Sequence, residues 1–494
     1  MFYPQFDRVR ELAKSFNVIP ISMEIPADME TPISLFKRFE EREYCFLLES
    51  VEGGENWARY SIFGREPYLI VKSYSGKTTI DWIGGEQKEA GPNPIEIIRE
   101  IMESYKGANL PGLPRFNGGA VGYLGYDTIR YYENLPNMPE DDLGFPESCF
   151  MFSNEIFVYD HVKHKIHIIV NMHVKDNLER DYNSAVDRIK KIHQELVDTK
   201  WKITDTGPFG REKIGEKVDF SSNMTKESFC KNVLRAKEYI KKGDVSQVVL
   251  SQRLCVKTDE KPFNIYRGLR TVNPSPYMFY LKFDDFEVVG SSPEMLVRVE
   301  NGVVQTCPIA GTRKRGSTQE EDRDLERELL SDKKEIDEHR MLVKLGETDL
   351  GKVSKPGSIR IEKPMNVEKY SHVMHIVTNI KGDMREDMTA FDALAAVLPA
   401  GTLSGVPRLR AMEIIDELET VKRGPYGGAI GYFSFNGNLD SCITIRTMIL
   451  KGGKVYIQAG AGIVAQSVPE TEYEECINKS KALLKALEEA GGVG

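Results

Sequence analysis

Short runs in which apolar and polar residues alternate recur along this chain, and they limit its possible folds more than any other feature. Residues 43–48, Glu-Tyr-Cys-Phe-Leu-Leu, and 165–170, Lys-Ile-His-Ile-Ile-Val, are two of them, and both predict strands. Parallel sheets that are buried on both faces need continuous β-branched runs, which these segments lack. The sequence therefore predicts an α+β fold of antiparallel sheets with helices packed on one face.

Helical patterns lie between the strand-like runs and divide the chain into two regions. We expect helices near residues 32–42, 93–105, 176–197, 225–242 and 469–490. Residues 202–220 combine glycines with many charges, which is typical of a linker. We therefore expect an N-terminal region over residues 1–200, a linker or long loop over 201–222, and a catalytic region over 223–494.

Composition and charge exclude several classes of protein. The 494 residues are 40% hydrophobic, which is enough for a large core. The formal net charge of −9 predicts no general attraction to nucleic acid or to an anionic membrane. The chain has no apolar run of about 18 residues and no signal-peptide pattern at its start, so we expect a cytoplasmic protein. Its seven cysteines are scattered without Cys-x-x-Cys spacing, which argues against disulfides and structural zinc.

Two acidic pairs suggest a site for a hard metal ion. Glu335 with Glu338, and Glu472 with Glu475, are each spaced three residues apart in helical stretches, so each pair points two carboxylates the same way. Carboxylate oxygens are the ligands that Mg²⁺ prefers, and retained waters leave room for an anionic substrate. The same spacing occurs elsewhere among the 75 acidic residues, so the spacing alone favours a solvated helix face, and only the neighbouring motifs favour a metal site.

Four further motifs carry chemistry suited to anions or protons. Residues 308–313 predict a strand that ends in a Gly-Thr turn, where backbone N–H groups bind an oxyanion. The glycines of residues 458–463 allow backbone amides to approach a carboxylate. His375 lies on a strand-like segment and suits proton transfer, although a hydrogen-bonded core histidine fits as well. Arg446 lies in an apolar, strand-like segment, where an unpaired guanidinium is costly, so it requires an anion.

Together these motifs describe a site for a small polycarboxylate, and in their order along the chain they closely resemble the chorismate-utilising enzymes, in particular component I of the anthranilate synthases. The resemblance covers nearly the whole chain. The motifs that carry it are residues 243–253 (Gly-Asp-Val-Ser-Gln-Val-Val-Leu-Ser-Gln-Arg), 290–295 (Gly-Ser-Ser-Pro-Glu-Met), 308–312, 370–375, 399–405 and 469–475.

The resemblance implies an orthogonally packed pair of antiparallel sheets flanked by helices, with chorismate bound beside Mg²⁺. It implies that Glu338 and Glu475 hold the metal and that Glu335 and Glu472 contact it through water. It also implies a general acid, Glu294, and a proton acceptor, His375. The residues expected to bind the substrate are Gly311, Thr312, Thr402, Tyr426, Arg446, Gly460, Ala461, Gly462 and Lys479.

Two positions separate the activities of this family. Members that add water to the ring carry a lysine at the position of Gln247, and glutamine cannot act as that base. Aminodeoxychorismate synthases commonly carry a nucleophilic lysine at the position of Ala310. Direct amination to anthranilate therefore fits best. Two alternatives remain: an aminodeoxychorismate or aminodeoxyisochorismate synthase, and a regulatory protein that binds chorismate or tryptophan without catalysis.

The resemblance also implies regulation and a partner. Segments matching the family's tryptophan feedback pocket include Glu49, Ser50, Pro276, Tyr277, Met278 and Phe279. A purely structural role in the core is the other interpretation of these segments. No cysteine lies in the glycine-rich elbow of a glutamine amidotransferase, so we expect a separate glutaminase subunit to supply ammonia.

One segment departs from the family pattern. Residues 344–349 read Lys-Leu-Gly-Glu-Thr-Asp, where the family generally has Asp-Leu-(Gly/Ala)-Arg-Asn-Asp, and Arg408 replaces a common lysine. The two reversed charges, Lys344 and Glu347, either form a new ion pair or weaken metal binding.

Overall fold

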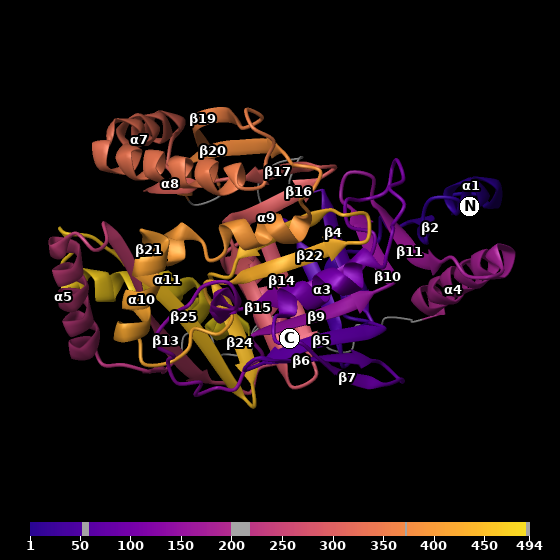
Figure 1. Ribbon diagram of the computed structural model, residues 1–494, viewed down its shortest axis with the longest axis horizontal. Coiled ribbons are helices and arrows are strands. Elements are labelled where there is room, and N and C mark those ends of the chain that lie inside the picture. Colours follow the sequence, from indigo (N-terminus) through magenta and orange to yellow (C-terminus); the bar gives the residue numbers. More distant parts are fainter. Residues whose placement is uncertain (52–58, 199–217, 371–372, 491–494) are drawn as a thin grey trace.

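Two large antiparallel sheets dominate the computed structural model, which describes residues 1–51, 59–198, 218–370 and 373–490 (Figure 1). The first sheet has the strand order β1 (Phe2–Tyr3), β2 (Val18–Pro26), β11 (Lys165–His173), β10 (Glu155–Asp160), β4 (Tyr60–Arg65), β3 (Cys45–Glu49), β14 (Tyr277–Phe283), β15 (Phe286–Ser292), β24 (Thr447–Lys451), β25 (Lys454–Ile463), β13 (Gln247–Lys257) and β12 (Ser221–Ser222), and β21 (Gly405–Val406) also pairs with β13.

The second sheet has the order β18 (Ile309–Lys314), β20 (Val373–Asp383), β17 (Val303–Thr306), β16 (Met295–Glu300), β23 (Leu439–Ile443), β22 (Ala429–Ser434), β8 (Gly119–Leu124), β9 (Ser148–Ser153), β5 (Leu69–Tyr74), β6 (Lys77–Trp82) and β7 (Gln87–Ala90), with β19 (Arg360–Lys369) paired to β20. The α+β prediction with antiparallel sheets is confirmed.

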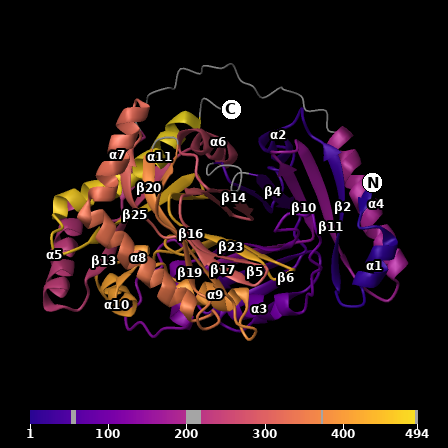
Figure 2. The same cartoon turned by 90° about the horizontal axis from the view of Figure 1, so that it is seen from above.

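Helices cover the outer face of each sheet. They are α1 (Phe6–Leu12), α2 (Pro32–Phe36), α3 (Pro94–Glu103), α4 (Leu178–Asp198), α5 (Lys226–Lys242), α6 (Pro262–Val272), α7 (Gln319–Ser331), α8 (Lys333–Gly351), α9 (Ala390–Val397), α10 (Arg408–Leu418) and α11 (Pro469–Ala490), with 3₁₀ turns η1 (Tyr126–Tyr131) and η2 (Gly401–Leu403). Figure 2 shows α5, α10 and α11 at one end of the molecule and α1 and α4 at the other. No helix among the described residues is long and apolar enough to cross a membrane.

The alternation seen in the sequence places successive side chains in two different cores. In β3, Cys45 and Leu47 face the core beneath helices α2, α4 and α6, whereas Phe46 faces the core between the two sheets. The core between the sheets also takes Val121 from β8, and a third core lies between the second sheet and helices α3 and α9. This sequence of layers, helices, sheet, sheet and helices, explains why both faces of most strands are buried.

The two regions expected on either side of residue 200 share both sheets. Met278 of β14 pairs with Glu49 of β3, and Gly431 of β22 pairs with Gly122 of β8. Residues 201–217 of the expected linker lie outside the described residues. The last two residues of the expected linker, Ser221–Ser222, form β12. The division into separate regions therefore stays a prediction, and the strand pairing joins the two regions closely.

The expected helices agree with α3, α4, α5 and α11 to within a few residues. The helix expected over residues 32–42 is wrong beyond Phe36. Thr31 and Ser34 form a capping box and Pro32 fixes the first turn, but after Lys37 the backbone continues as turns.

We expect Gly64→Ala to destabilise the protein, because a Cβ at Gly64 would lie 2.5 Å from two ring carbons of buried Phe46. Overpacking of this kind costs about 1–3 kcal/mol, which thermal unfolding would detect as a lower midpoint. Gly91→Ala is the control, since nothing lies within 4 Å of a Cβ there. Adding Phe46→Leu to Gly64→Ala should recover part of the loss, and additive losses would contradict the contact.

Candidate active site

The two acidic pairs lie on different helices, α8 and α11. Asp332 caps the N-terminus of α8 by accepting from the backbone N–H of Lys334 and of Glu335, which starts the helix just before the first pair. Burial raises the pKa of Glu338, and the carboxylates of Glu335 and Glu475 raise it further. Burial likewise raises the pKa of Glu472, with Glu475 adding to the effect. The prediction that both pairs lie on helices is confirmed, and the tertiary fold brings the pairs within electrostatic reach.

The donor chemistry of these carboxylates fits a hard divalent cation. Negative groups that raise one another's pKa are stabilised by a cation between them, and oxygen ligands are those that Mg²⁺ prefers. Among the described residues, no group of three or more His, Cys, Asp or Glu side chains lies close enough together to hold a metal ion. Lys479 lies 2.7 Å from the Glu475 carboxylate and partly neutralises it. The assignment of Glu335, Glu338, Glu472 and Glu475 as metal ligands stays a prediction.

Lys479 is the residue around which the predicted site converges. Its ammonium group donates to the carbonyl of Gly460 at 2.8 Å, and its own carbonyl accepts from the Arg446 guanidinium. A Cβ on Gly460 would lie 2.8 Å from the Tyr426 hydroxyl, so Tyr426 contacts the same strand. These contacts bring together residues from β25, α11 and two loops.

Arg446 does not lie in a strand, which corrects the sequence prediction. Its φ of +50° forms a left-handed kink between β23 and β24 that ends the pairing of one strand and begins the next. Burial lowers the pKa of the guanidinium, as expected for a cation removed from water. The kink aims Arg446 toward α11.

The glycine-rich end of β25 exposes backbone amides on one edge. Gly460, Ala461 and Gly462 pair with β13 on one side, whereas β24 pairs with β25 only as far as Ile457 within the described residues. Amides on the unpaired edge are free to bind an anion. Gln247 of β13 reaches over the face of the sheet at Gly462, because a Cβ on Gly462 would approach its amide nitrogen to 2.6 Å.

The predicted Gly-Thr turn is instead a β-bulge inside β18. Ala310 pairs with Ile376 and Thr312 pairs with His375, so Gly311 is the extra residue, with φ +66°. The carbonyl of Gly311 lies 3.0 Å from Nδ1 of His375, and the Thr312 hydroxyl lies 3.1 Å from the same nitrogen. Because a carbonyl can only accept, Nδ1 carries the proton and Nε2 keeps a lone pair. Burial lowers the pKa of His375, so the ring is neutral and suited to accept a proton.

Glu294 has the properties of a general acid. Burial raises its pKa to about 7, while the Thr402 hydroxyl, which donates at 3.3 Å, and Lys479 lower it by less. Glu294 and Thr402 line one cavity together with Asp349 and Arg408. A carboxyl with a pKa near 7 can donate a proton at the pH of a cell.

Ion pairs that the sequence did not predict lie in and near this cavity. Arg408 forms an ion pair with Asp349, which joins α10 to α8, and both residues line the cavity together with Thr402. Buried Arg423 and Glu419 form another ion pair, and the Arg423 guanidinium lies 5.7 Å from the Tyr426 ring centre. The sequence offered one local signal for Arg423, because charged residues directly precede the Gly-Pro-Tyr segment at residues 424–426. Lys344 and Glu347, the two reversed charges in the segment that departs from the family pattern, form an ion pair at 3.5 Å. This is one of the two outcomes expected for them.

The six residues expected to form a regulatory site line a second cavity. Glu49 ends β3 and Ser50 follows it, whereas Pro276 directly precedes β14, which begins with the other three residues and pairs with β3. Across the cavity, the Tyr277 hydroxyl donates to Asp440 at 2.9 Å and Arg298 donates to the same carboxylate at 3.0 Å. The cavity therefore lies between the two sheets and contacts strands of both.

This fold is that of the chorismate binding enzymes. The profile of that family matches residues 44–485, and the chain belongs to it. Within the family, anthranilate synthase component 1 of Acetivibrio thermocellus is 68% identical over the full length of both chains, and that of Aquifex aeolicus is 45% identical over 98% of this chain and 97% of its own. The crystal structure of anthranilate synthase component I from Streptococcus pneumoniae TIGR4 has a TM-score of 0.76 and 38% identity over 93% of this chain and 99% of its own. MenF, the menaquinone-specific isochorismate synthase from Escherichia coli, shares the fold, with a TM-score of 0.70 and 18% identity over 98% of this chain and 100% of its own.

We expect Glu294→Gln to make stability less sensitive to pH. The folded-state pKa near 7 exceeds the unfolded value of 4.5, so the wild type binds more protons when folded and loses stability as pH rises from 4.5 to 7. Glutamine removes this loss, so the variant should be more stable than the wild type at pH 8, by about 1–3 kcal/mol, and similar at pH 5.

Thermal unfolding at both pH values tests this expectation. Glu41→Gln serves as the control, since the Glu41 side chain is 82% exposed. An equal difference between Glu294→Gln and the wild type at pH 5 and pH 8 would show that the carboxyl does not titrate between them.

Proposed function

We propose that this chain catalyses the anthranilate synthase reaction, in which chorismate and ammonia give anthranilate, pyruvate and water. The observation that carries the proposal is the 68% identity to a full-length anthranilate synthase component 1, together with a raised-pKa acid and a neutral histidine in the same site. Gln247 and Ala310 favour amination, because neither supplies the lysine that water addition or covalent attack requires.

The side chains divide the work of binding. Arg446, Tyr426 and the unpaired amide edge of β25 bind the carboxylate of the enolpyruvyl group. Gly311, Thr312, Thr402 and Lys479 complete the pocket around the ring. Glu338 and Glu475 would hold Mg²⁺ directly and Glu335 and Glu472 through water, and the bound ion would neutralise the ring carboxylate.

Two proton transfers carry the chemistry. Glu294 donates its proton to the 4-hydroxyl, which leaves as water while ammonia forms a bond to ring carbon 2. The neutral His375 then accepts the proton from carbon 2 at Nε2. That electron pair makes the ring aromatic and breaks the bond to the enolpyruvyl oxygen, which leaves as pyruvate. Each proton transfer contributes about 10²–10⁴ in rate.

The nitrogen source is a separate glutaminase subunit, which we place with this chain in the cytoplasm. Five of the seven cysteines are buried, and burial raises the pKa of each of them: Cys45, Cys149, Cys307, Cys442 and Cys476. Thiols held protonated in this way are poor nucleophiles for glutamine. Tryptophan inhibits the enzyme by binding the cavity between the sheets, where Arg298 and Asp440 offer charged partners beside an apolar wall.

The first test is incubation of the purified chain with chorismate, Mg²⁺ and ammonium at alkaline pH. We expect anthranilate fluorescence and pyruvate to appear in equal amounts and tryptophan to suppress both. Glutamine in place of ammonium should give no product without the partner subunit. Loss of chorismate without anthranilate would instead support an aminodeoxy product, and no turnover would contradict the proposed activity.

We expect Ser50→Phe to make the enzyme insensitive to tryptophan with little change in KM for chorismate. Ser50 lines the cavity between the sheets, and a phenyl ring there would fill space needed by the indole ring. Inhibition curves for tryptophan measure the effect, with Ser50→Ala as the size-matched control. Unchanged inhibition of the Phe variant would place the tryptophan site elsewhere.

A further inference from the structure

Two residues from the end of β19 lie beside His375, and none of the steps above uses them. His375 of β20 is paired with Thr312 of β18 on one side and with Glu368 of β19 on the other. Residues directly opposite each other in antiparallel strands share one face of the sheet. The other face of β20 is closed by α7, because Met374 packs against Leu329. Glu368 therefore lies in the same cross-strand row as the proposed base.

Tyr370, which directly follows β19, packs against the imidazole. The ring centres of Tyr370 and His375 lie 5.7 Å apart, and the ring planes are tilted by 60°. The Tyr370 hydroxyl donates to the Glu368 carboxylate at 3.0 Å. Diagonal neighbours on one face of a sheet are within reach of an aromatic side chain. Tyr370 and Glu368 thus form one connected unit on the β19 side of His375.

The backbone of Tyr370 is held at both ends. Its N–H donates to the carbonyl of Val373 at 2.8 Å, and its carbonyl accepts from the Arg315 guanidinium. Arg315 is in turn fixed by an ion pair with Asp322 of α7 at 2.9 Å. A side chain whose own position is fixed in this way can hold a neighbouring group in one orientation.

The surroundings make the charge of Glu368 effective at the imidazole. Glu368 and Tyr370 line a cavity whose other walls are mostly apolar, and charges interact more strongly where little water screens them. Burial lowers the pKa of His375, the Gly311 carbonyl and Glu368 offset part of this effect, and Arg446 lowers the pKa further. A negative charge at this position stabilises the imidazolium that forms when His375 accepts a proton.

We propose that Tyr370 and Glu368 are positioning residues for proton transfer to His375. Tyr370 holds the imidazole so that Nε2 faces the substrate, and Glu368 stabilises the charged ring after the transfer. The inference rests on the proposed function, in which His375 removes the proton from ring carbon 2 after amination. Amination uses Glu294 instead, so loss of the unit should slow the second step and spare the first.

The test compares the two steps in Tyr370→Leu, which removes the ring. A single turnover with the enzyme in excess over chorismate counts bound as well as released intermediates. We expect the appearance of anthranilate to slow at least about tenfold and the loss of chorismate to slow less than about threefold. The difference should accumulate as the aminated ring that still carries the enolpyruvyl group. An equal slowing of both steps would overturn the proposal, because general damage to the site acts on both.

Tyr370→Phe keeps the proposal testable if Tyr370→Leu fails to fold. It retains the ring and removes only the bond to Glu368, so the appearance of anthranilate should slow about two- to fivefold. Tyr132→Leu is the matched control, since the Tyr132 hydroxyl also donates to a glutamate, Glu96, at 3.0 Å, and it should change neither step. Anthranilate formation at the wild-type rate in Tyr370→Phe would overturn the role of the hydroxyl contact.

A readout without chorismate separates this inference from the proposed function. Glu368→Gln removes the charge but still accepts from Tyr370, so the pKa of His375 should fall below the wild-type value. NMR titration of the imidazole signals measures this pKa, with His375→Gln to assign them. An unchanged pKa would overturn the role of Glu368. A lower pKa in Glu368→Gln together with a wild type that forms no anthranilate would defeat the proposed function and leave the contact with His375 standing.

Discussion

The buried ion pair between Arg423 and Glu419 is the interaction on which the geometry of the site depends. The Arg423 guanidinium donates to Glu419 at 2.6 and 2.8 Å, to the carbonyl of Leu403 at 2.7 Å and to that of Val249 at 2.8 Å. The Tyr126 ring lies 4.6 Å from the same guanidinium. One cation thus joins β13, the loop that carries Thr402, and the loop that carries Tyr426. Removing either partner would leave a buried charge unpaired, which costs about 3–5 kcal/mol.

The sheets then place three kinds of chemistry around this pair. The unpaired edge of β25 and the kinked Arg446 can bind a carboxylate, because the pairing of β24 with β25 ends at Ile457 within the described residues and leaves that edge open. The bulge at Gly311 fixes the tautomer of His375, and burial gives Glu294 a pKa near 7. An acid that holds its proton and a base that lacks one can therefore coexist at one pH, as the reaction requires.

The pairing of β3 with β14 has a separate consequence for regulation. It joins the first part of the chain to the part that carries the proposed catalytic residues, and the proposed regulatory cavity opens where β3 ends and β14 begins. A ligand held there contacts both sheets. Differential binding at this position can change the relation between the sheets, and so the site, without touching the substrate.

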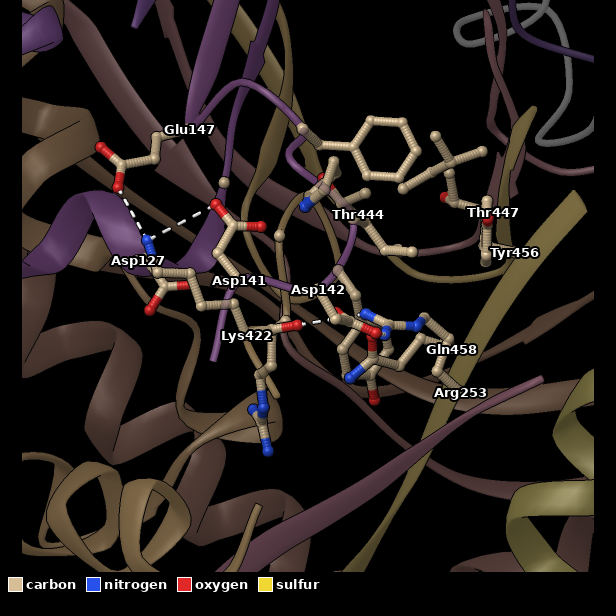
Figure 3. Close-up of a pocket in the computed structure, with 18 residues that line it drawn as sticks. Asp127, Asp141, Asp142, Glu147, Arg253, Lys422, Thr444, Thr447, Tyr456 and Gln458 are labelled. Carbon is tan, nitrogen blue, oxygen red and sulfur yellow. Dashed lines mark hydrogen bonds and ion pairs between the residues drawn. The ribbon is translucent and has the colours of Figure 1, made fainter. Parts of the chain in front are cut away.

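Much of this was readable in the sequence. Alternating strands predicted the antiparallel fold, and residue types and spacing pointed to the acidic pairs, His375 and the glycines of residues 458–463 as candidates. Glu294 became a candidate only through the resemblance to the chorismate-utilising enzymes. Two local predictions at the site were wrong: Gly311 was expected in a turn and lies in a bulge, and Arg446 was expected in a strand and lies in a kink. A glycine tolerates both a turn and a bulge, so only the register with β20 decides between them. The sequence could not predict the cavity lined by Asp127, Asp142 and Arg253 (Figure 3), because its walls come from segments hundreds of residues apart. Sequence determines which groups are present and which local conformations they allow; distances, shared cations and buried acceptors follow only from the tertiary packing that brings distant segments into contact.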